Sequence, residues 1–249
     1  DALLARADAT RPVTIGFLGG EPFANRALIH RSISYASSEG RSRGLNVRFS
    51  VTTNGTLLNA DDIALMRSHR MAVTISIDGG TRIQDRQRPS GGRMARGSFA
   101  ALTKAIAPLL ADPGRAQIAA RATVTRHDLD LQHRFEDILA LGFSEVGFSP
   151  LRMDKDGSGA LHDGDWLSYL DALTRVAGGE LARARQGLPI RLSNFAIALK
   201  QIARGASSPY PCGAGGGYFS VAAGGRWYAC HRAIGQLEFE MGDSTGINE

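Results

Sequence analysis

Strand-like and helix-like segments alternate along most of the chain, and this alternation constrains the fold more than any other feature. Strands are expected at residues 13–18, 45–52, 71–78, 117–125 and 144–149, and helices at 25–39, 60–69, 98–111, 129–140, 163–186 and 193–204. Strands separated by helices pair in parallel, because each parallel connection needs a crossover of about a dozen residues or more. The pattern predicts an α/β fold built on a parallel sheet.

One face of four of the expected strands carries polar side chains, whereas strands covered by helices on both faces read as near-continuous apolar runs. The polar residues expected on the inward face are Arg48, Ser50, Thr52, Thr74, Ser76, Asp78, Arg121, Thr123 and Ser149. Burying such groups without partners costs roughly several kcal/mol. A barrel lumen that holds a polar ligand would satisfy them, and a solvated sheet face is the alternative.

The composition bears on possible partners. The 29 Lys and Arg residues against 24 Asp and Glu residues give a net charge of +5, but the arginines are scattered along the sequence, which argues against a nucleic-acid partner. No apolar run approaches the roughly eighteen residues of a membrane-spanning helix, and no secretory signal is visible. We therefore predict a cytoplasmic protein with no membrane or nucleic-acid partner.

A Gly-Gly-Glu-Pro turn, Gly19 to Pro22, follows the first expected strand. The glycines let a ligand approach the backbone closely, and Pro22 restricts the turn. Glu21 stands at the carboxyl end of a strand, where α/β barrels place their chemistry, and its carboxylate suits an ammonium group. Taken alone, the tetrapeptide is also compatible with an ordinary tight turn.

Three further strand ends carry motifs: the Thr-Thr-Asn-Gly segment that contains Asn54, the Ser-Ile-Asp-Gly segment from Ser76 to Gly79, and the Arg-Ala-Thr-Val-Thr segment that begins at Arg121. In this order and spacing the motifs resemble the radical S-adenosylmethionine (SAM) superfamily. The resemblance covers residues 13–150.

The two cysteines, Cys212 and Cys230, lie in a Gly-rich tail. A hairpin is expected between them, with strands at 218–221 and 226–229 and a turn at 223–225. The Cys-Gly-Ala-Gly start and the Tyr-Ala-Cys-His-Arg end resemble the opening of the SPASM auxiliary-cluster domain of radical SAM peptide maturases. Inert core thiols are the alternative.

The resemblance implies a SAM site formed by Gly19, Gly20, Glu21, Pro22, Asn54, Ser76, Asp78, Arg121 and Leu151. Within that set, Glu21 would hold the methionine amino group, Arg121 the carboxylate and Leu151 the adenine. Ser76 and Asp78 would face the ribose or nearby groups. Cys212 and Cys230 would be thiolate ligands of an auxiliary [4Fe–4S] cluster, with the backbone N–H groups of residues 213–217 directed at its sulfides.

The chain departs from the family pattern in two places. The Cys-x3-Cys-x2-Cys motif that binds the catalytic [4Fe–4S] cluster is absent, and so are the later SPASM cysteines. A fragment that lacks both segments is expected, and such a chain alone would be inactive. A degenerate member that has lost its chemistry is the alternative.

His231 bears on the subfamily. Formylglycine-forming sulfatase maturases carry Asp directly after the cysteine that aligns with Cys230, whereas this chain has His231. The residue favours maturases that install crosslinks or build peptide-derived quinone cofactors, such as those of quinohemoprotein amine dehydrogenases. His231 is thus a candidate catalytic residue, with a structural histidine as the alternative.

Taken together, the resemblance implies a partial (β/α)6 TIM-type barrel over residues 1–190, followed by a linker helix and a truncated SPASM domain over 191–249. The implied function is peptide or protein maturation, in which a 5′-deoxyadenosyl radical abstracts hydrogen from a peptide residue. A flavodoxin or ferredoxin would donate electrons. A catalytically inactive peptide-binding barrel and an ordinary TIM-barrel enzyme that uses Glu21 and Asp78 are the alternatives.

Overall fold

The computed structural model describes residues 2–5, 7–90, 97–154, 156–205 and 213–247. Its centre is a parallel sheet with strand order β1-β2-β3-β4-β5. The strands are β1 (Val13–Phe17), β2 (Val47–Thr53), β3 (Met71–Ser76), β4 (Gln117–Val124) and β5 (Val146–Pro150). Each matches an expected strand to within about two residues. Leu192 adds a single parallel bridge to Val146, so the chain after β5 begins a sixth position of the sheet.

Helices connect consecutive strands, which is the arrangement of a partial TIM-type barrel. They are α2 (Arg26–Ser42), α3 (Ala60–Ser68), α4 (Thr81–Gln87), α5 (Phe99–Ala111), α6 (Leu131–Ala140), α7 (Asp163–Arg185) and α8 (Ser193–Arg204), with short turns α1 (Ala2–Ala5) and η1 (Pro22–Asn25). Helix α4 was not among the predicted elements. Asn59 followed three residues later by Asp62 is a capping-box pattern in the sequence, and the structure has this capping box at the start of α3.

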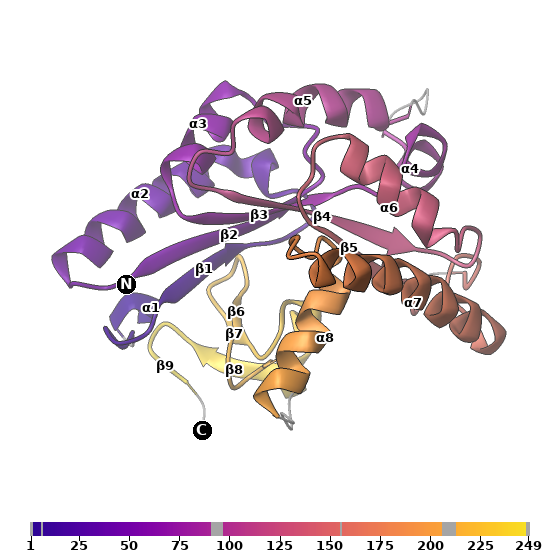
Figure 1. The fold of residues 1–249 in the computed structure, drawn as a ribbon. Helices are drawn as coiled ribbons and strands as arrows, with labels where there is room; N and C mark the ends of the chain where they lie inside the picture. The colour runs from indigo at the N-terminus through magenta and orange to yellow at the C-terminus, as the bar shows by residue number, and fades with distance from the viewer. Residues whose placement is uncertain (1, 6, 91–96, 155, 206–212, 248–249) are drawn as a thin grey trace.

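The two faces of the sheet differ as the alternation predicts. Apolar side chains of β2, β3 and β4 are buried against the helices, and Figure 1 shows α2, α3 and α5 on that side. On the other face, Ser76 pairs in register with Arg121, and Arg121 pairs with Gly147. Thr52 and Thr74 are paired in the same way. The polar residues of neighbouring strands therefore share one face.

The C-terminal part lies on the side of the sheet opposite α2, α3 and α5 (Figure 1). It forms an antiparallel sheet of β6 (Ser220–Val221), β7 (Trp227–Tyr228), β8 (Glu240–Asp243) and β9 (Gly246–Ile247), with short turns η2 (His231–Ala233) and η3 (Leu237–Phe239). The expected hairpin is present, although each of its strands spans two residues. Strands β8 and β9 were not predicted. Trp227 and Tyr228 are buried, and the ring of Trp227 stacks on Phe219 at 4.7 Å between centroids.

In the part of the chain that the structure describes, no helix combines the length and the apolar character that a bilayer crossing requires.

Candidate functional site

The Gly-Gly-Glu-Pro turn connects β1 to η1 and presents an open backbone. Gly19 has a φ of +157°, and a Cβ atom built at Gly19 or Gly20 would meet no atom within 4 Å. Glu21 is the N-cap of η1, and its Oε1 accepts a hydrogen bond from the backbone N–H of Phe23 at 3.1 Å. The local sequence therefore holds the Glu21 carboxylate beside a stretch of backbone that a ligand can approach.

The same carboxylate also joins β1 to β2. Oε1 of Glu21 accepts a hydrogen bond from the Thr53 hydroxyl at 2.6 Å, and Oε2 accepts one from the backbone N–H of Asn54 at 2.7 Å. A carboxylate offers about four acceptor positions, of which the hydrogen bonds from Phe23, Thr53 and Asn54 use three. One position remains for a donor from a ligand. Thr53 was not among the predicted site residues.

The loop after β2 is braced from the starts of α2 and α3. Asp62 is fully buried and accepts hydrogen bonds from Arg26, from the backbone N–H of Asn59, and from His30 at 2.8 Å when that ring nitrogen is protonated. Arg26 also donates to the backbone carbonyl of Leu57 at 2.6 Å. Because a buried carboxylate needs such partners, the brace restrains the backbone that carries Asn54.

Asp78 lies beyond the end of β3 and is 1% exposed. Arg88 donates from Nε to Oδ2 at 2.7 Å and from Nη2 to Oδ1 at 3.2 Å, and the backbone N–H of Thr123 donates to Oδ1 at 2.7 Å. The Asp78 carboxylate thus joins the ends of β3 and β4 instead of lining an open lumen. Arg88, in the loop after α4, was not predicted to take part.

A buried arginine completes this region. Arg134 of α6 is fully buried and donates to the backbone carbonyls of Asp78 at 2.6 Å, Thr123 at 2.6 Å and Asp128 at 3.2 Å. Burial lowers the pKa of Arg134, and the charges of Asp78 and Asp128 oppose that effect. The sequence carried a signal for the burial of this side chain, but not for its partners, because Arg134 occupies an apolar-face position of its helix beside Phe135.

Arg121 lies on the face of the sheet opposite α2, α3 and α5. A Cβ atom at Gly147 would lie 2.1 Å from its Nη1, so only glycine on β5 leaves room for the guanidinium. Burial raises the pKa of Tyr169, and the charge of Arg121 is among the effects that oppose the rise. Among the described residues, Arg121 forms no ion pair with a carboxylate. Its fork of donors is therefore available to an anionic group.

Ser76 is the register partner of Arg121 and is half-buried on the same face. Leu151 directly follows β5, where its backbone N–H donates to the carbonyl of Val124 at 2.8 Å. Both residues thus lie at the carboxyl half of the sheet, together with Glu21 and Asp78. The structure brings these predicted residues to one edge, as the motifs at the strand ends implied.

Cys230 lies between β7 and η2, and Cys212 lies outside the described residues. The Sγ atom of Cys230 is 3.0 Å from the Tyr218 hydroxyl and 3.4 Å from the backbone nitrogen of Arg232. Hydrogen bonds from Tyr218 and then from Arg232 lower the pKa of the Cys230 thiol, which favours the metal-binding thiolate. His231 is exposed, and its Nδ1 is 3.9 Å from the sulfur.

The backbone N–H groups of residues 213–217 were expected to be directed at cluster sulfides, and for most of these residues the expectation is wrong. The N–H of Gly215 donates to the carbonyls of Tyr218 and Ala229, and the N–H groups of residues 216–218 donate to the carbonyl of Gly213. A turn closed on itself has no free donors there for cluster sulfides. The described residues contain no group of three potential metal ligands, so Cys230 is a lone candidate ligand within them.

No family model matches the chain. Curated proteins do match parts of the chain. The chain is 32% identical over 92 residues to a cysteine-type anaerobic sulfatase-maturating enzyme of Clostridium novyi (strain NT), covering 37% of this chain and 24% of that protein. It is 24% identical over 169 residues to a serine-type anaerobic sulfatase-maturating enzyme of Klebsiella aerogenes, covering 67% of this chain and 40% of that protein.

Solved structures of a similar protein share the fold of this chain. Native anSMEcpe with bound AdoMet superposes with a TM-score of 0.79 at 18% identity, over 98% of this chain and 65% of that one. The same protein with bound AdoMet and Kp18Cys peptide gives a TM-score of 0.78 at 17% identity, over 97% and 66%. At such identities the solved structures establish the fold.

The chain is similar to the anaerobic sulfatase-maturating enzymes over part of their length. The expected resemblance to radical SAM maturases of the SPASM type is confirmed, and so is the partial barrel. The chain spans about two thirds or less of the length of each of these similar proteins.

Proposed function

We propose that the intact protein is a radical SAM maturase that binds SAM at the carboxyl edge of this sheet and acts on a residue of a bound peptide. The observation that carries the proposal is a complementary pair of groups. Glu21 has one free acceptor position beside an open Gly-Gly backbone, and Arg121 has a guanidinium with no carboxylate partner among the described residues. An ammonium and a carboxylate, as at the amino-acid end of SAM, fit such a pair.

The residues present fit SAM, and each would act by binding or positioning. Glu21 would accept a hydrogen bond from the ammonium, and Arg121 would donate to the carboxylate. The contacts of Asp78 support a positioning role, because its carboxylate already accepts bonds from Arg88 and Thr123. Gly19, Gly20, Pro22 and Asn54 would form the turn around the ligand, with Ser76 and Leu151 beside its nucleoside part.

A reduced [4Fe–4S] cluster would supply the electron for reductive cleavage of SAM, and the resulting 5′-deoxyadenosyl radical would abstract hydrogen from the peptide. We assign this cluster to cysteines of the intact protein beyond the two in this sequence. The lowered pKa of Cys230 supports a second role, as a thiolate ligand of an auxiliary cluster together with Cys212. His231 stays a candidate for proton transfer beside that site.

The proposed partners are a peptide or protein substrate and a one-electron donor such as a flavodoxin or ferredoxin. The similar protein anSMEcpe has been solved with a Kp18Cys peptide, which supports a peptide substrate here. The substitution of His231 for the acid of formylglycine-forming maturases favours crosslink or quinone-cofactor maturation. The cytoplasmic setting stays a prediction.

An ordinary acid–base enzyme is a weaker proposal for this site. Its two carboxylates would be Glu21 and Asp78, but both accept hydrogen bonds from groups that hold neighbouring strands together. Asp78 is also paired with Arg88 and buried, so it has no open face toward a substrate.

Calorimetric titration of SAM into the full-length protein tests the proposal. Glu21→Gln should weaken SAM binding by about 1.5–3 kcal/mol, the scale of a hydrogen bond to a charged group. Glu39→Gln is the matched control, because Glu39 pairs with Arg43 on exposed α2 and lies away from the turn. Equal SAM affinity in the Glu21 and Glu39 variants would contradict the assignment, provided that thermal melting shows both folded.

A further inference from the structure

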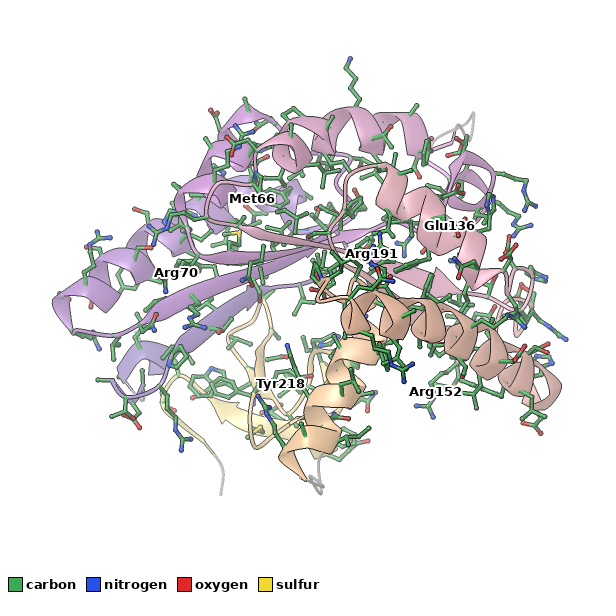
Figure 2. All side chains as sticks on the ribbon, viewed as in Figure 1. Met66, Arg70, Glu136, Arg152, Arg191 and Tyr218 are labelled. Carbon is green, nitrogen blue, oxygen red and sulfur yellow. The ribbon has the colours of Figure 1, made fainter. Side chains whose placement is uncertain are left out.

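Three arginines gather at the amino edge of the parallel sheet, the end opposite the proposed SAM site. Arg48 is in β2, while Arg70 and Arg115 come just before β3 and β4. Together with Thr14 and Gln117 they line a cavity of about 440 Å³. Figure 2 labels Arg70 among the side chains of this region. Arginines far apart in the sequence therefore form one surface, which the sequence pattern did not predict.

These cations lack counter-charges among the described residues. Arg48, Arg70 and Arg115 form no ion pair there, and no Asp or Glu of the described chain lines the cavity. A neighbouring cavity of about 380 Å³ shares Arg70 and Arg115 and adds Arg41 and His69, again without a described acidic residue. Like charges that gather without partners repel one another, so an anionic ligand would stabilise this surface.

Backbone contacts hold the arginines in place. The carbonyl of Arg70 accepts a hydrogen bond from the N–H of Phe49 at 3.3 Å, and the N–H of Arg115 donates to the carbonyl of Arg67 at 2.9 Å. Arg48 lies within β2 and pairs in register with Thr14. Because the backbone is restrained at each position, the three side chains extend from fixed points at this edge.

Part of the cavity lining lies on the same face of the sheet as the proposed SAM site. Arg48 and Gln117 lie on the face of the sheet opposite α2, α3 and α5. Ala72 and Ser76 of β3 lie on the same face. Ala72 and Ser76 are four residues apart, which corresponds to roughly 13 Å along a strand. The rows between the two ends carry small side chains such as Thr74.

We propose that the amino-edge arginines bind acidic residues of the substrate peptide and so select for an acidic substrate. This inference rests on the proposed function. An extended peptide advances about 3.3–3.6 Å per residue. The acidic residues should therefore lie about four to six positions from the residue that reacts at the carboxyl edge. Charge pairs of this kind contribute to selectivity and to the association rate.

Fluorescence anisotropy of the full-length protein with labelled peptides tests the inference without catalysis. One probe is a peptide of about twelve residues, with a cysteine near one end and three glutamates about five residues away. The matched probe has glutamines in place of the glutamates. We expect the glutamate peptide to bind about tenfold more tightly at low salt, and the preference to shrink as salt is added.

Variants locate the binding surface. Arg48→Gln and Arg115→Gln should each reduce affinity for the glutamate peptide about two- to fivefold, as expected for exposed charge pairs. Arg175→Gln removes the same charge from exposed α7 and should leave the affinity unchanged. The double variant Arg48→Glu with Arg115→Glu should reverse the preference, so that a lysine peptide binds better than the glutamate peptide.

Two results would overturn the inference. One is equal binding of the glutamate and glutamine peptides, or an equal loss in the Arg175 variant. The other is tighter, arginine-dependent binding of a single-stranded oligonucleotide, which would make the surface a nucleic-acid site. SAM titration on the same preparations separates the two proposals: retained SAM binding without a peptide preference contradicts only the acidic-substrate inference.

Discussion

At the carboxyl edge of the parallel sheet, Glu21 and Asp78 each accept several hydrogen bonds from neighbouring strands and loops. At the amino edge, Arg48 and Arg115 have no acidic partner among the described residues. The two edges therefore use charge differently. Paired and buried charges hold backbone segments in a defined geometry, whereas exposed and unpaired charges are available to a partner.

The comparison also separates structural roles from binding roles within one site. Arg134 donates to three backbone carbonyls and is fully buried, so its loss should affect folding. Arg121 shares its charge type, but its guanidinium lies on the open face beside Gly147. The sign of the charge alone does not distinguish these roles. The partners of each side chain distinguish them.

Arg134→Leu should give the largest effect. Removal of the guanidinium leaves the carbonyls of Asp78, Thr123 and Asp128 without their donor, and we expect the free energy of unfolding to fall by about 3–5 kcal/mol. Urea unfolding followed by circular dichroism measures this. Arg175→Leu on exposed α7 is the control, with an expected change below about 0.5 kcal/mol. Similar losses in both variants would contradict the structural role of Arg134.

Asp78→Asn should lower the free energy of unfolding by about 2 kcal/mol, because the paired Arg88 loses its charged acceptor while the N–H of Thr123 keeps an oxygen acceptor. Chemical denaturation checks the value against Asp171→Asn, a change in an exposed pair on α7. A stability equal to that of the wild type would show that the carboxyl edge does not depend on this pair.

Glu180→Gln tests the ion pair between Glu180 and Arg191, which lies beside the start of β5. Glu180 accepts hydrogen bonds from the backbone N–H and the guanidinium of Arg191. Burial would raise the pKa of Glu180, but these hydrogen bonds and the charges of Arg191 and Arg183 hold it below the ordinary value of 4.5. The unfolded state therefore binds the proton more tightly, so the stabilisation is present above pH 4.5 and disappears as the pH falls through the folded-state pKa.

We expect Glu180→Gln to cost about 1 kcal/mol at neutral pH. Urea midpoints from about pH 7 to about pH 3 should show the wild-type advantage shrinking in the acidic range. A difference between the two proteins that is constant over this range would refute the linkage. A difference that grows toward low pH would do the same.

Arg48→Gln should have the smallest effect on stability. An unpaired cation contributes no ion pair and repels its neighbours, so we expect a change within about 0.5 kcal/mol, in the stabilising direction. Thermal melting at low and high salt checks both the size and the sign, since salt should reduce the gain. A clear destabilisation would indicate that Arg48 has a structural partner, and would weaken the contrast between the edges.

Much of the fold could be predicted from local patterns. The strand at 45–52 alternates strictly between apolar and polar residues, and β2 is found there with its apolar face buried. The spacing of Asn59 and Asp62 is also a local pattern, and these residues form a capping box at the start of α3. Helix α4 and strands β8 and β9 escaped prediction because they are short. Their sequences carry too few turns or alternations to show a period.

The site was predicted in its positions but not in its contacts. The motifs at the strand ends placed Glu21, Ser76 and Arg121 at one edge, where the structure also has them. The pairing of Asp78 with Arg88 and the buried contacts of Arg134 were not foreseen. An arginine in a loop or on a helix gives no local sign of which carbonyl or carboxylate it will reach.

The sequence by itself determined the order of strands and helices, the polar and apolar faces, and the residues at the strand ends. These follow from side-chain periodicity and backbone preferences, which act over a few residues. The tertiary structure alone decided that Gly147 makes room for Arg121, and that Arg48, Arg70 and Arg115 meet at one edge. Such contacts depend on strand register, which is set by the packing of segments far apart in the chain.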